Sequence, residues 1–349
     1  MPRVVGSDPG TGSLDLLLLV DGRVEGQASL TPEALRSDPG VLVATLRGWG
    51  PVDLIAGPSG YGLPLVRGED VTEAEVDLMA LVRPDGRGVD AGVIGFRSWV
   101  RALLGSGLPT IFLPGGVHLP TIPAHRKANA IDMGTADKVA VAALALRSDR
   151  ASGGDGTFAV VEIGSAFTAV LVLEGGRIVD ASAGSRGPIG MKSGGAWDGE
   201  AACWLGPISK ADLFRGGVGD LGPAGPDAFR ESLVRHVAGL RAVTPFDRIY
   251  LSGSAVSGEG RADLRRSVGR ALAPLGNVVP IGGLAGARVK EAAQGAALLA
   301  DGLAGGGSAW LVEALDLRSA SGTILDYLAI RKGPGSIPAG PSSPGNLPS

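Results

Sequence analysis

The 349-residue sequence has a single cysteine, Cys203, and almost no net charge. One thiol can form neither an internal disulfide nor a cysteine-based metal site, which favours a reducing compartment, and we expect it to be buried. A formal net charge of −3 gives no electrostatic reason to expect a nucleic acid or an anionic membrane as partner. The longest apolar runs, such as Leu16–Val20 and Val139–Leu146, are too short to span a bilayer. Because no signal-peptide pattern follows Met1, we expect a soluble, cytoplasmic protein.

Two common phosphate-binding signatures are also missing. A P-loop requires Gly-Lys followed by Ser or Thr, and the chain contains no such tripeptide. A dinucleotide-binding fold requires a glycine-rich turn that opens a helix. Gly10-Thr-Gly12 is followed instead by an apolar run and a second turn, which is typical of strands. A β-hairpin that cradles phosphate is the remaining interpretation of this glycine-rich turn.

The N-terminal stretch recurs in the middle of the chain. Asp8–Val24 aligns without a gap with Glu162–Ile178, at an offset of 154 residues. Each copy predicts a strand, a polar turn, a second strand, a glycine-centred hairpin turn and a third strand. A period of this length is too long for a solenoid and indicates two homologous domains.

Helical patterns alternate with short buried strands after each hairpin, which predicts an α/β fold. The predicted helices are 41–49, 91–104, 135–147, 200–205, 227–243, 261–273, 288–303 and one near 311–317, and the predicted strands are 52–56, 110–113, 248–252 and 278–281. The glycine-rich residues 148–156 are expected to link a domain of residues 1–150 to one of residues 151–330, and the region near 308–330 to pack back on the first domain. Residues 333–349, rich in Gly, Pro and Ser, predict a disordered tail.

Both glycine-rich turns carry the residue types that a phosphate cradle requires. An acid at the end of the first strand can hold Mg²⁺, while N–H groups and hydroxyls of the turn bind phosphate oxygens. The candidate metal ligands are Asp8 and Glu162, and the candidate phosphate-binding residues are Gly10, Thr11, Gly12, Ser13, Gly164, Ser165 and Thr168. Asp8 could instead cap a turn before Pro9, but an acid at the same place in both copies favours the metal role.

These motifs resemble those of the acetate/sugar kinase–Hsp70–actin superfamily. Gly6–Gly12 is similar to its first phosphate motif, Glu162–Thr168 to its second, and Leu251–Ala255 to its adenosine motif, which places Gly253 and Ser254 beside the nucleotide. The resemblance implies two ribonuclease-H-like (actin-like ATPase) domains that hold ATP and Mg²⁺ in the cleft between them. The second motif usually begins with Asp, whereas this chain has Glu, whose carboxylate lies one methylene further out.

Residues 131–138, Ile-Asp-Met-Gly-Thr-Ala-Asp-Lys, resemble more closely a prokaryotic family of predicted butyrate kinases. They are also similar to the histidine-containing Gly-Thr-Ser segment of acetate kinases, with Asp132 and Asp137 in place of the flanking histidines. The resemblance implies an ATP-dependent kinase that phosphorylates a small carboxylate or hydroxyl compound, with Asp8, Arg126 and Asp132 as catalytic residues. The substrate side would be formed by Thr135, Asp137, Lys138, Trp197 and Asp198. Related kinases often dimerise, so a homodimer is one expectation.

The substrate-side residues also have purely structural interpretations. Asp132 or Thr135 could cap a helix that Asp137 stabilises through the helix dipole, and Asp198 could cap another helix with Trp197 as a hydrophobic staple. Two further functions stay open, because fold analogy alone does not decide function. One is an ATP-driven conformational switch or activator, and the other is a degenerate protein that binds nucleotide without turnover.

Overall fold

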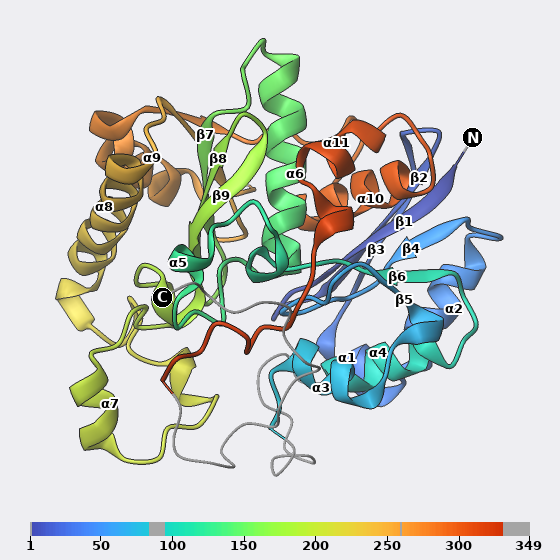
Figure 1. Cartoon of the computed structure of the whole chain (residues 1–349), viewed down its shortest axis with the longest axis horizontal. Helices are drawn as coiled ribbons and strands as arrows, with labels where there is room; N and C mark the ends of the chain where they lie inside the picture. The colour runs from blue at the N-terminus through green and yellow to red at the C-terminus, as the bar shows by residue number, and fades with distance from the viewer. Residues whose placement is uncertain (1, 84–94, 259, 331–349) are drawn as a thin grey trace, which may run out of the picture.

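The computed structural model describes residues 2–83, 95–258 and 260–330. Two mixed β-sheets lie side by side, with helices between them and on their outer faces (Figure 1). The predicted tail, residues 333–349, and the first four residues of the predicted helix 91–104 lie outside the described residues.

The first sheet has the strand order β3-β2-β1-β4-β6-β5. Its strands are β1 (Arg3–Pro9), β2 (Leu14–Val20), β3 (Arg23–Leu30), β4 (Leu54–Ala56), β5 (Val66–Arg67) and β6 (Thr110–Phe112). The first three form an antiparallel meander, and β4 and β6 extend the sheet parallel to β1. The hairpin between β2 and β3 turns at Asp21 and Gly22, whose φ angles of 52° and 71° are the left-handed values that such a turn requires.

The second sheet, ordered β11-β10-β7-β8-β9, repeats this arrangement. Its strands are β7 (Phe158–Ile163), β8 (Thr168–Glu174), β9 (Arg177–Ser182), β10 (Arg248–Ser252) and β11 (Asn277–Pro280). An antiparallel meander again comes first, and β10 and β11 again add parallel strands to its first strand. The sequence repeat is therefore a repeat of the fold, and the predicted fold class of two ribonuclease-H-like α/β halves is confirmed.

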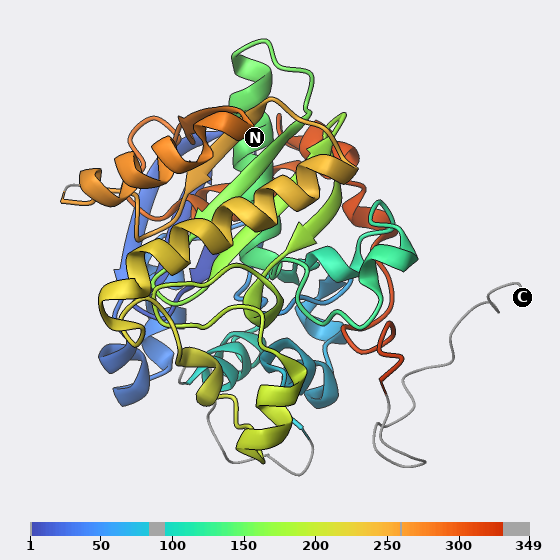
Figure 2. The ribbon, with the colours of Figure 1, turned by 90° about the vertical axis from the view of Figure 1, so that its left-hand side faces the viewer.

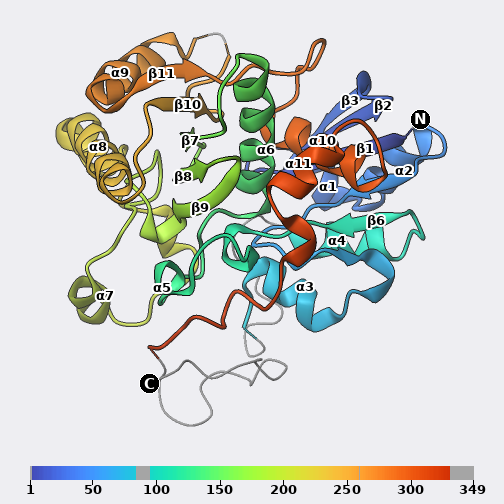
Figure 3. The ribbon, with the colours of Figure 1, turned by 45° about the horizontal axis from the view of Figure 1, so that its top comes forward.

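Helices cover the outer faces of both sheets (Figures 2 and 3). The helices of the first half are α1 (Pro32–Ser37), α2 (Gly40–Gly48), α3 (Glu73–Ala80), α4 (Phe96–Leu104), α5 (Ala124–Lys127) and α6 (Ala136–Ala151). Those of the second half are α7 (Gly199–Leu205), α8 (Gly225–Val243), α9 (Ala262–Leu272), α10 (Glu291–Leu303) and α11 (Ala309–Ala314). No helix in the described residues has both the length and the apolarity that crossing a membrane requires.

Two local predictions are wrong. The linker predicted at 148–156 begins later, because α6 continues to Ala151 while the buried Asp149 bonds Arg248 at 2.6 Å and the backbone N–H of Gly156 at 2.9 Å. Cys203 is exposed rather than buried, because α7 is a short helix that buries none of its residues.

The C-terminal described residues return to the first half. The region predicted as helical near 308–330 contains α11, and Ser321 then donates its backbone N–H to the carbonyl of His118 (3.0 Å). Further on, the backbone N–H of Asn129 donates to the carbonyl of Tyr327 (2.8 Å). The division of the chain at residue 150 into two domains stays a prediction.

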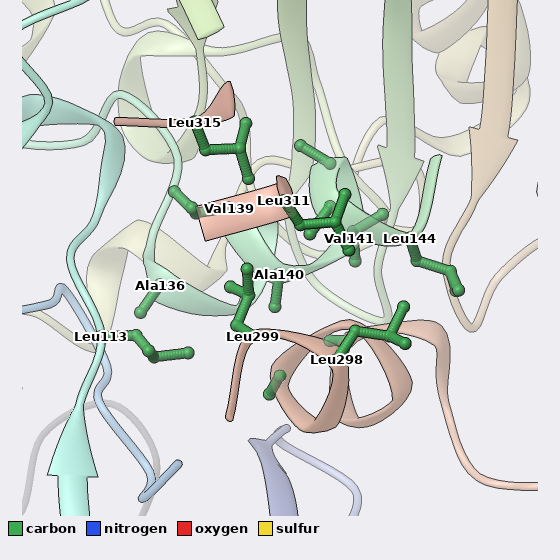
Figure 4. Close-up of a cluster of buried hydrophobic side chains, with 14 of the residues drawn as sticks. Leu113, Ala136, Val139, Ala140, Val141, Leu144, Leu298, Leu299, Leu311 and Leu315 are labelled. Carbon is green, nitrogen blue, oxygen red and sulfur yellow. The ribbon is translucent and has the colours of Figure 1, made fainter. Parts of the chain in front are cut away.

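The helices α6 and α10 lie between the two sheets and pack tightly on each other (Figures 1 and 4). Each of them also packs on the sheet of the opposite half, since α6 contacts β7 and β8 while α10 contacts β1, β2 and β4. The approach is close on both sides of α10. A methyl group on Gly295 would lie 1.8 Å from the carbonyl oxygen of Ala140 in α6, and one on Gly6 in β1 would lie 2.1 Å from the nitrogen of Ala297. Both glycines are therefore required by backbone packing.

We expect Gly295→Ala to destabilise the protein by roughly 3 kcal/mol, because the added methyl forces α6 and α10 apart. The matched control is Gly239→Ala in α8, where the methyl would meet nothing within 4 Å and the change should stabilise by about 0.5–1 kcal/mol through helix propensity. Urea unfolding of both variants measures the difference. Equal effects at the two sites would show that the close packing of α10 does not limit stability.

Candidate functional site

A cleft of about 990 Å³ lies between the two halves, which is within the usual size range of ligand pockets. It is lined by the turn after β1, the turn after β7, the start of α6, the loop after β10 and the start of α10. All five segments end or begin at the same edge of the two sheets. In α/β folds this edge, beyond the carboxyl ends of the parallel strands, is the usual place for a ligand.

The two glycine-rich turns face each other across this cleft. Thr11 Oγ1 and Ser165 Oγ lie 2.6 Å apart and share a hydrogen bond, and they are separated by 154 residues, the offset of the sequence repeat. Each turn is closed by the same internal bond, from Gly10 N–H to Ser13 O (3.0 Å) and from Gly164 N–H to Phe167 O (2.9 Å). Equivalent residues of the two halves thus meet in this contact.

The strand-end acids Asp8 and Glu162 occupy equivalent places at the base of the two turns. Their exposed fractions are only 4% and 8%. Burial raises the pKa of Asp8 to about 6, against the opposing charge of Lys290. Burial likewise raises the pKa of Glu162 to about 7, against the charge of Lys138. Both carboxylates are incompletely compensated, so a further cation in the cleft would stabilise their ionised forms.

The lysine beside each acid comes from the helix of the opposite half. Lys138, in the first turn of α6, places Nζ 3.2 Å from Glu162 Oε2. Lys290, the residue before α10, places Nζ 3.5 Å from Asp8 Oδ2. The crossed packing of α6 and α10 thus produces a crossed pair of lysine–acid contacts at the cleft.

Lys138 is held by a second acid as well. Its Nζ also donates to Asp137, and Thr135 donates its hydroxyl to the same carboxylate. Burial raises the pKa of Asp137, but the charge and hydrogen bond of Lys138 outweigh it and leave this pKa below its usual value. The pKa of Lys138 is raised, because Asp137 and Glu162 together outweigh the effect of burial. The ammonium of Lys138 thus lies between two acidic side chains.

Asp15 and Lys290 belong to the site but were not predicted from the sequence. Asp15 lies opposite Asp8 in the β1–β2 pairing, and its carboxylate accepts the backbone N–H of Lys290 at 3.1 Å. Lys290 Nζ lies 3.8 Å from the same carboxylate and donates to Ser13 O at 3.2 Å. The available signal was the single charged residue in the otherwise apolar strand Leu14–Val20.

The loop after β10 completes the nucleotide side. Gly253 has φ +107°, and a methyl group there would lie 2.3 Å from the carbonyl oxygen of Ile163, so this position accepts only glycine. Ser254, next in the chain, lines the cleft. Ser252 also lines it, and its buried hydroxyl has no hydrogen-bond partner among the described residues. Glu162 Oε2 likewise accepts no hydrogen bond, although Lys138 Nζ lies nearby.

The opposite end of the cleft combines an acid, a lysine and apolar walls. Asp132 accepts the backbone N–H of Gly134 at 2.9 Å, and burial raises its pKa to about 6. Lys210 lies with Nζ 5.0 Å from the ring centroid of Tyr61 and donates to the carbonyl of Ala80 across the cleft. Burial lowers the pKa of Lys210 to about 8, although Asp132 opposes the shift. The apolar walls include Met79, Leu81, Phe96, Leu213 and Phe214.

Most of the predicted site residues line this cleft. They are Asp8, Gly10, Thr11, Gly12, Asp132, Thr135, Asp137, Lys138, Glu162, Gly164, Ser165, Gly253 and Ser254. The other five are not part of its lining. Ser13 donates its hydroxyl to Asp15 at 2.7 Å, and Thr168 is buried within β8. Asp198 caps α7 by accepting the N–H of Glu200 at 2.9 Å, as its structural interpretation predicted, and Trp197 precedes it.

Arg126, the predicted acceptor-binding arginine, does not reach the cleft. Its guanidinium donates to Val179 O at 2.9 Å and lies 3.7 Å from Asp180, on the outer side of the second sheet. Arg126 lies only a few residues before Asp132 in the sequence. However, Arg126 is in α5 and borders a separate hollow, whereas Asp132 follows α5 and lines the cleft. Lys210, from the second half, supplies a positive charge at this end instead.

Solved structures share the arrangement of the fold. Acetate kinase from Entamoeba histolytica superposes with a TM-score of 0.55 at 10% identity, covering 80% of this chain and 96% of that one. A ROK family glucokinase from Streptomyces griseus gives 0.44 at 19% identity, covering 85% and 99%. The (R)-2-hydroxyglutaryl-CoA dehydratase component A of Acidaminococcus fermentans gives 0.40 at 11% identity, covering 87% and 100%. The likeness to the fold of acetate kinase extends over 80% of this chain, in line with the resemblance of the sequence motifs.

The sequence comparisons give a family without an assigned activity. No curated protein matches the chain. Residues 6–330, which include every segment that lines the cleft, match one family along their whole length. The chain therefore belongs to the family described as "Protein of unknown function (DUF1464)".

Proposed function

We propose that the protein is an ATP-dependent phosphotransferase whose nucleotide lies in the cleft between the two halves. The observation that carries the proposal is the pair of equivalent glycine-rich turns that meet at Thr11 and Ser165. A phosphate chain between the turns would replace this hydroxyl–hydroxyl bond with hydrogen bonds from backbone N–H groups and both hydroxyls. The loop at Gly253 and Ser254 would hold the adenosine side.

The residues of the cleft also fit Mg²⁺. Asp8 is a buried carboxylate whose lysine partner is 3.5 Å away. Glu162 Oε2 lies 3.2 Å from Lys138 Nζ but accepts no hydrogen bond from the described residues. No described group of three or more His, Cys, Asp or Glu side chains could form a metal site by itself. This suits Mg²⁺, which commonly binds to one or two carboxylates together with substrate phosphates and water. Asp8 would hold the ion, which when bound neutralises charge on the phosphates, and Glu162 would contribute through water.

For the acceptor we propose a small carboxylate, as in butyrate or acetate kinases. The support is the end of the cleft where Lys210 lies beside Tyr61 and Asp132 among apolar walls. The ammonium would attract the carboxylate, while the apolar side chains would contact the body of the molecule. A hydroxyl compound is the alternative acceptor, because Asp132 could then act as the general base.

In the proposed reaction an acceptor oxygen attacks the γ-phosphorus of ATP, and the bond from that phosphorus to the bridging oxygen of ADP breaks. A carboxylate acceptor carries no proton on the attacking oxygen, so no base is needed. A hydroxyl acceptor would pass its proton to Asp132. Lys138 and Lys290 would compensate charge on the transferred group, so that the chain contributes positioning and electrostatic stabilisation.

A second candidate is a nucleotide-driven conformational switch. The contacts that join the halves at the cleft include the hydroxyl pair of Thr11 and Ser165 and the bond from Lys210 to the carbonyl of Ala80. A ligand that separates the turns would break the first of these contacts and change how the halves are held together. Such a switch would hydrolyse ATP at a rate that no small acceptor increases, and a degenerate member would bind ATP without turnover.

We expect ATP to bind more tightly with Mg²⁺ than without it, and Asp8→Asn to remove this Mg²⁺ dependence. The substitution keeps the size of the side chain but removes the carboxylate, so the Mg²⁺-dependent affinity should fall at least about tenfold. Calorimetric titration with ATP and with ATP–Mg²⁺ measures both affinities. Asp263→Asn on the exposed face of α9 is the control, and it should change neither affinity. Nucleotide binding that is absent, or that Asp8→Asn leaves unchanged, would refute the proposed site.

The pH dependence of turnover distinguishes the two acceptor classes. If Asp132 is a general base with a pKa of about 6, the rate falls about tenfold per pH unit below that value, because the protonated acid cannot accept the proton. Asp132→Asn would then lower the rate about 10²–10⁴-fold and remove this acidic limb. With a carboxylate acceptor, we expect Asp132→Asn to retain both the rate and the pH profile. A coupled ADP assay on matched acid and alcohol acceptors measures both. ADP formation that no acceptor increases would favour the switch.

A further inference from the structure

A second hollow borders the second half and shares one lining residue, Arg186, with the cleft. Its volume is about 540 Å³, and it is bordered by α5, the end of β9, the turn before residue 187 and one face of α8. The lining residues are His125, Arg126, Asp180, Ala181, Ser182, Arg186, Arg235, His236, Gly239, Leu240 and Val243. We call this hollow the α8 groove. Of these residues, Arg186 also lines the cleft. Arg126 is the one groove residue among the site residues predicted from the sequence.

One side of the α8 groove is cationic. Among the described residues, no carboxylate lies within ion-pair distance of Arg186, which donates instead to the backbone carbonyl of Arg126 at 3.4 Å. Arg235 forms an ion pair with Glu231 on the same exposed face of α8, and such surface pairs cancel little of a charge. His236 donates from Nδ1 to Ser232 O at 2.8 Å, which leaves Nε2 for a ligand.

Among the described residues that line the groove, the carboxylate is that of Asp180, and it already has polar partners. Asp180 accepts the N–H of Ala181 at 2.8 Å and lies 3.7 Å from the guanidinium of Arg126. Burial raises the pKa of Asp180, and the charges of Arg126 and Arg186 offset part of this shift. The guanidinium of Arg126 also donates to Val179 O, and its buried Nε has no partner among the described residues. Arg186 and Arg235 therefore give the groove a net positive charge.

The other side of the groove is apolar. Leu240 and Val243 lie on the last turns of α8, and Val243 is 62% exposed although it is a large apolar residue. Gly239, one residue before Leu240, also lines the groove, and the space beside its Cα is open. A hollow of this size with charged and apolar sides suits a small molecule that has an anionic head and an apolar body.

We propose that the α8 groove is a second ligand site, which binds a small phosphate monoester. Arginine forks match phosphate oxygens, and Arg186 and Arg235 would bind the phosphate while Leu240 and Val243 contact the organic part. The proposed site does not include the glycine-rich turns of the cleft, although Arg186 lines both hollows.

The test is calorimetric titration of the full-length protein with phenyl phosphate and, separately, with inorganic phosphate. We expect phenyl phosphate to bind more tightly, because only its ring can cover the apolar side of the groove. Arg235→Gln should weaken the binding of both probes about tenfold. Val243→Ser should weaken phenyl phosphate alone. Equal affinities for the two probes in the wild-type protein would overturn the assignment of the apolar side.

Two control variants distinguish binding in the groove from binding in the cleft and from a general effect of charge. Arg266→Gln on α9 removes an equally exposed arginine that also pairs with an acid on its own helix, so it should leave binding unchanged. Gly12→Asp places an acid in the cleft turn, where a side chain meets nothing within 4 Å, and it should also leave binding unchanged. Binding lost in Gly12→Asp would place the phosphate in the cleft, and equal losses in Arg235→Gln and Arg266→Gln would indicate a non-specific charge effect. Either result, or no binding at all, overturns the proposal, whether or not the cleft binds ATP.

Discussion

The backbone contact of α10 with β1 on one side and α6 on the other is the constraint on which the rest of the structure depends. At Gly6 and Gly295 no side chain separates the elements, so the two helices and the first sheet approach as closely as their backbones permit. Because α6 at the same time packs on the second sheet, this single layer fixes how the two halves face each other. The width of the cleft is therefore set by buried glycine and alanine residues, none of which would contact a ligand.

The same crossing determines the electrostatics of the cleft. Since α6 and α10 each lie against the sheet of the other half, Lys138 reaches Glu162 and Lys290 reaches Asp8. The largest compensating charge on each acid comes from the other half. A change in the relative position of the halves would alter both lysine–acid contacts together, and the burial that raises the pKa of both acids makes such a change costly. The electrostatics of the cleft therefore depend on how the two halves are arranged relative to each other.

Sequence reasoning succeeded where the information is local. The hairpin turns, the strand-end acids Asp8 and Glu162, and the first turn of α6 each lie within a short stretch, and the internal repeat identified two of them as equivalent. It failed where position depends on long-range packing. Lys210 reaches the cleft from a segment with no motif, while Arg126 turns outward although it lies only six residues before Asp132. Proximity in sequence says little about direction once a four-residue helix such as α5 intervenes.

The two halves are equivalent in fold but not in charge, and this difference bears on where the proposed metal ion would lie. Lys138 is held by Asp137 and Glu162 and is 17% exposed, whereas Lys290 lies 3.5 Å and 3.8 Å from its two acids and is 29% exposed. Because electrostatic attraction weakens with distance and with exposure to water, the ammonium of Lys290 is the easier of the two to displace. An incoming cation would therefore compete with Lys290 for Asp8 at a lower cost than with Lys138 for Glu162. This asymmetry supports the first turn as the metal side of the cleft, with Glu162 of the second turn contributing through water.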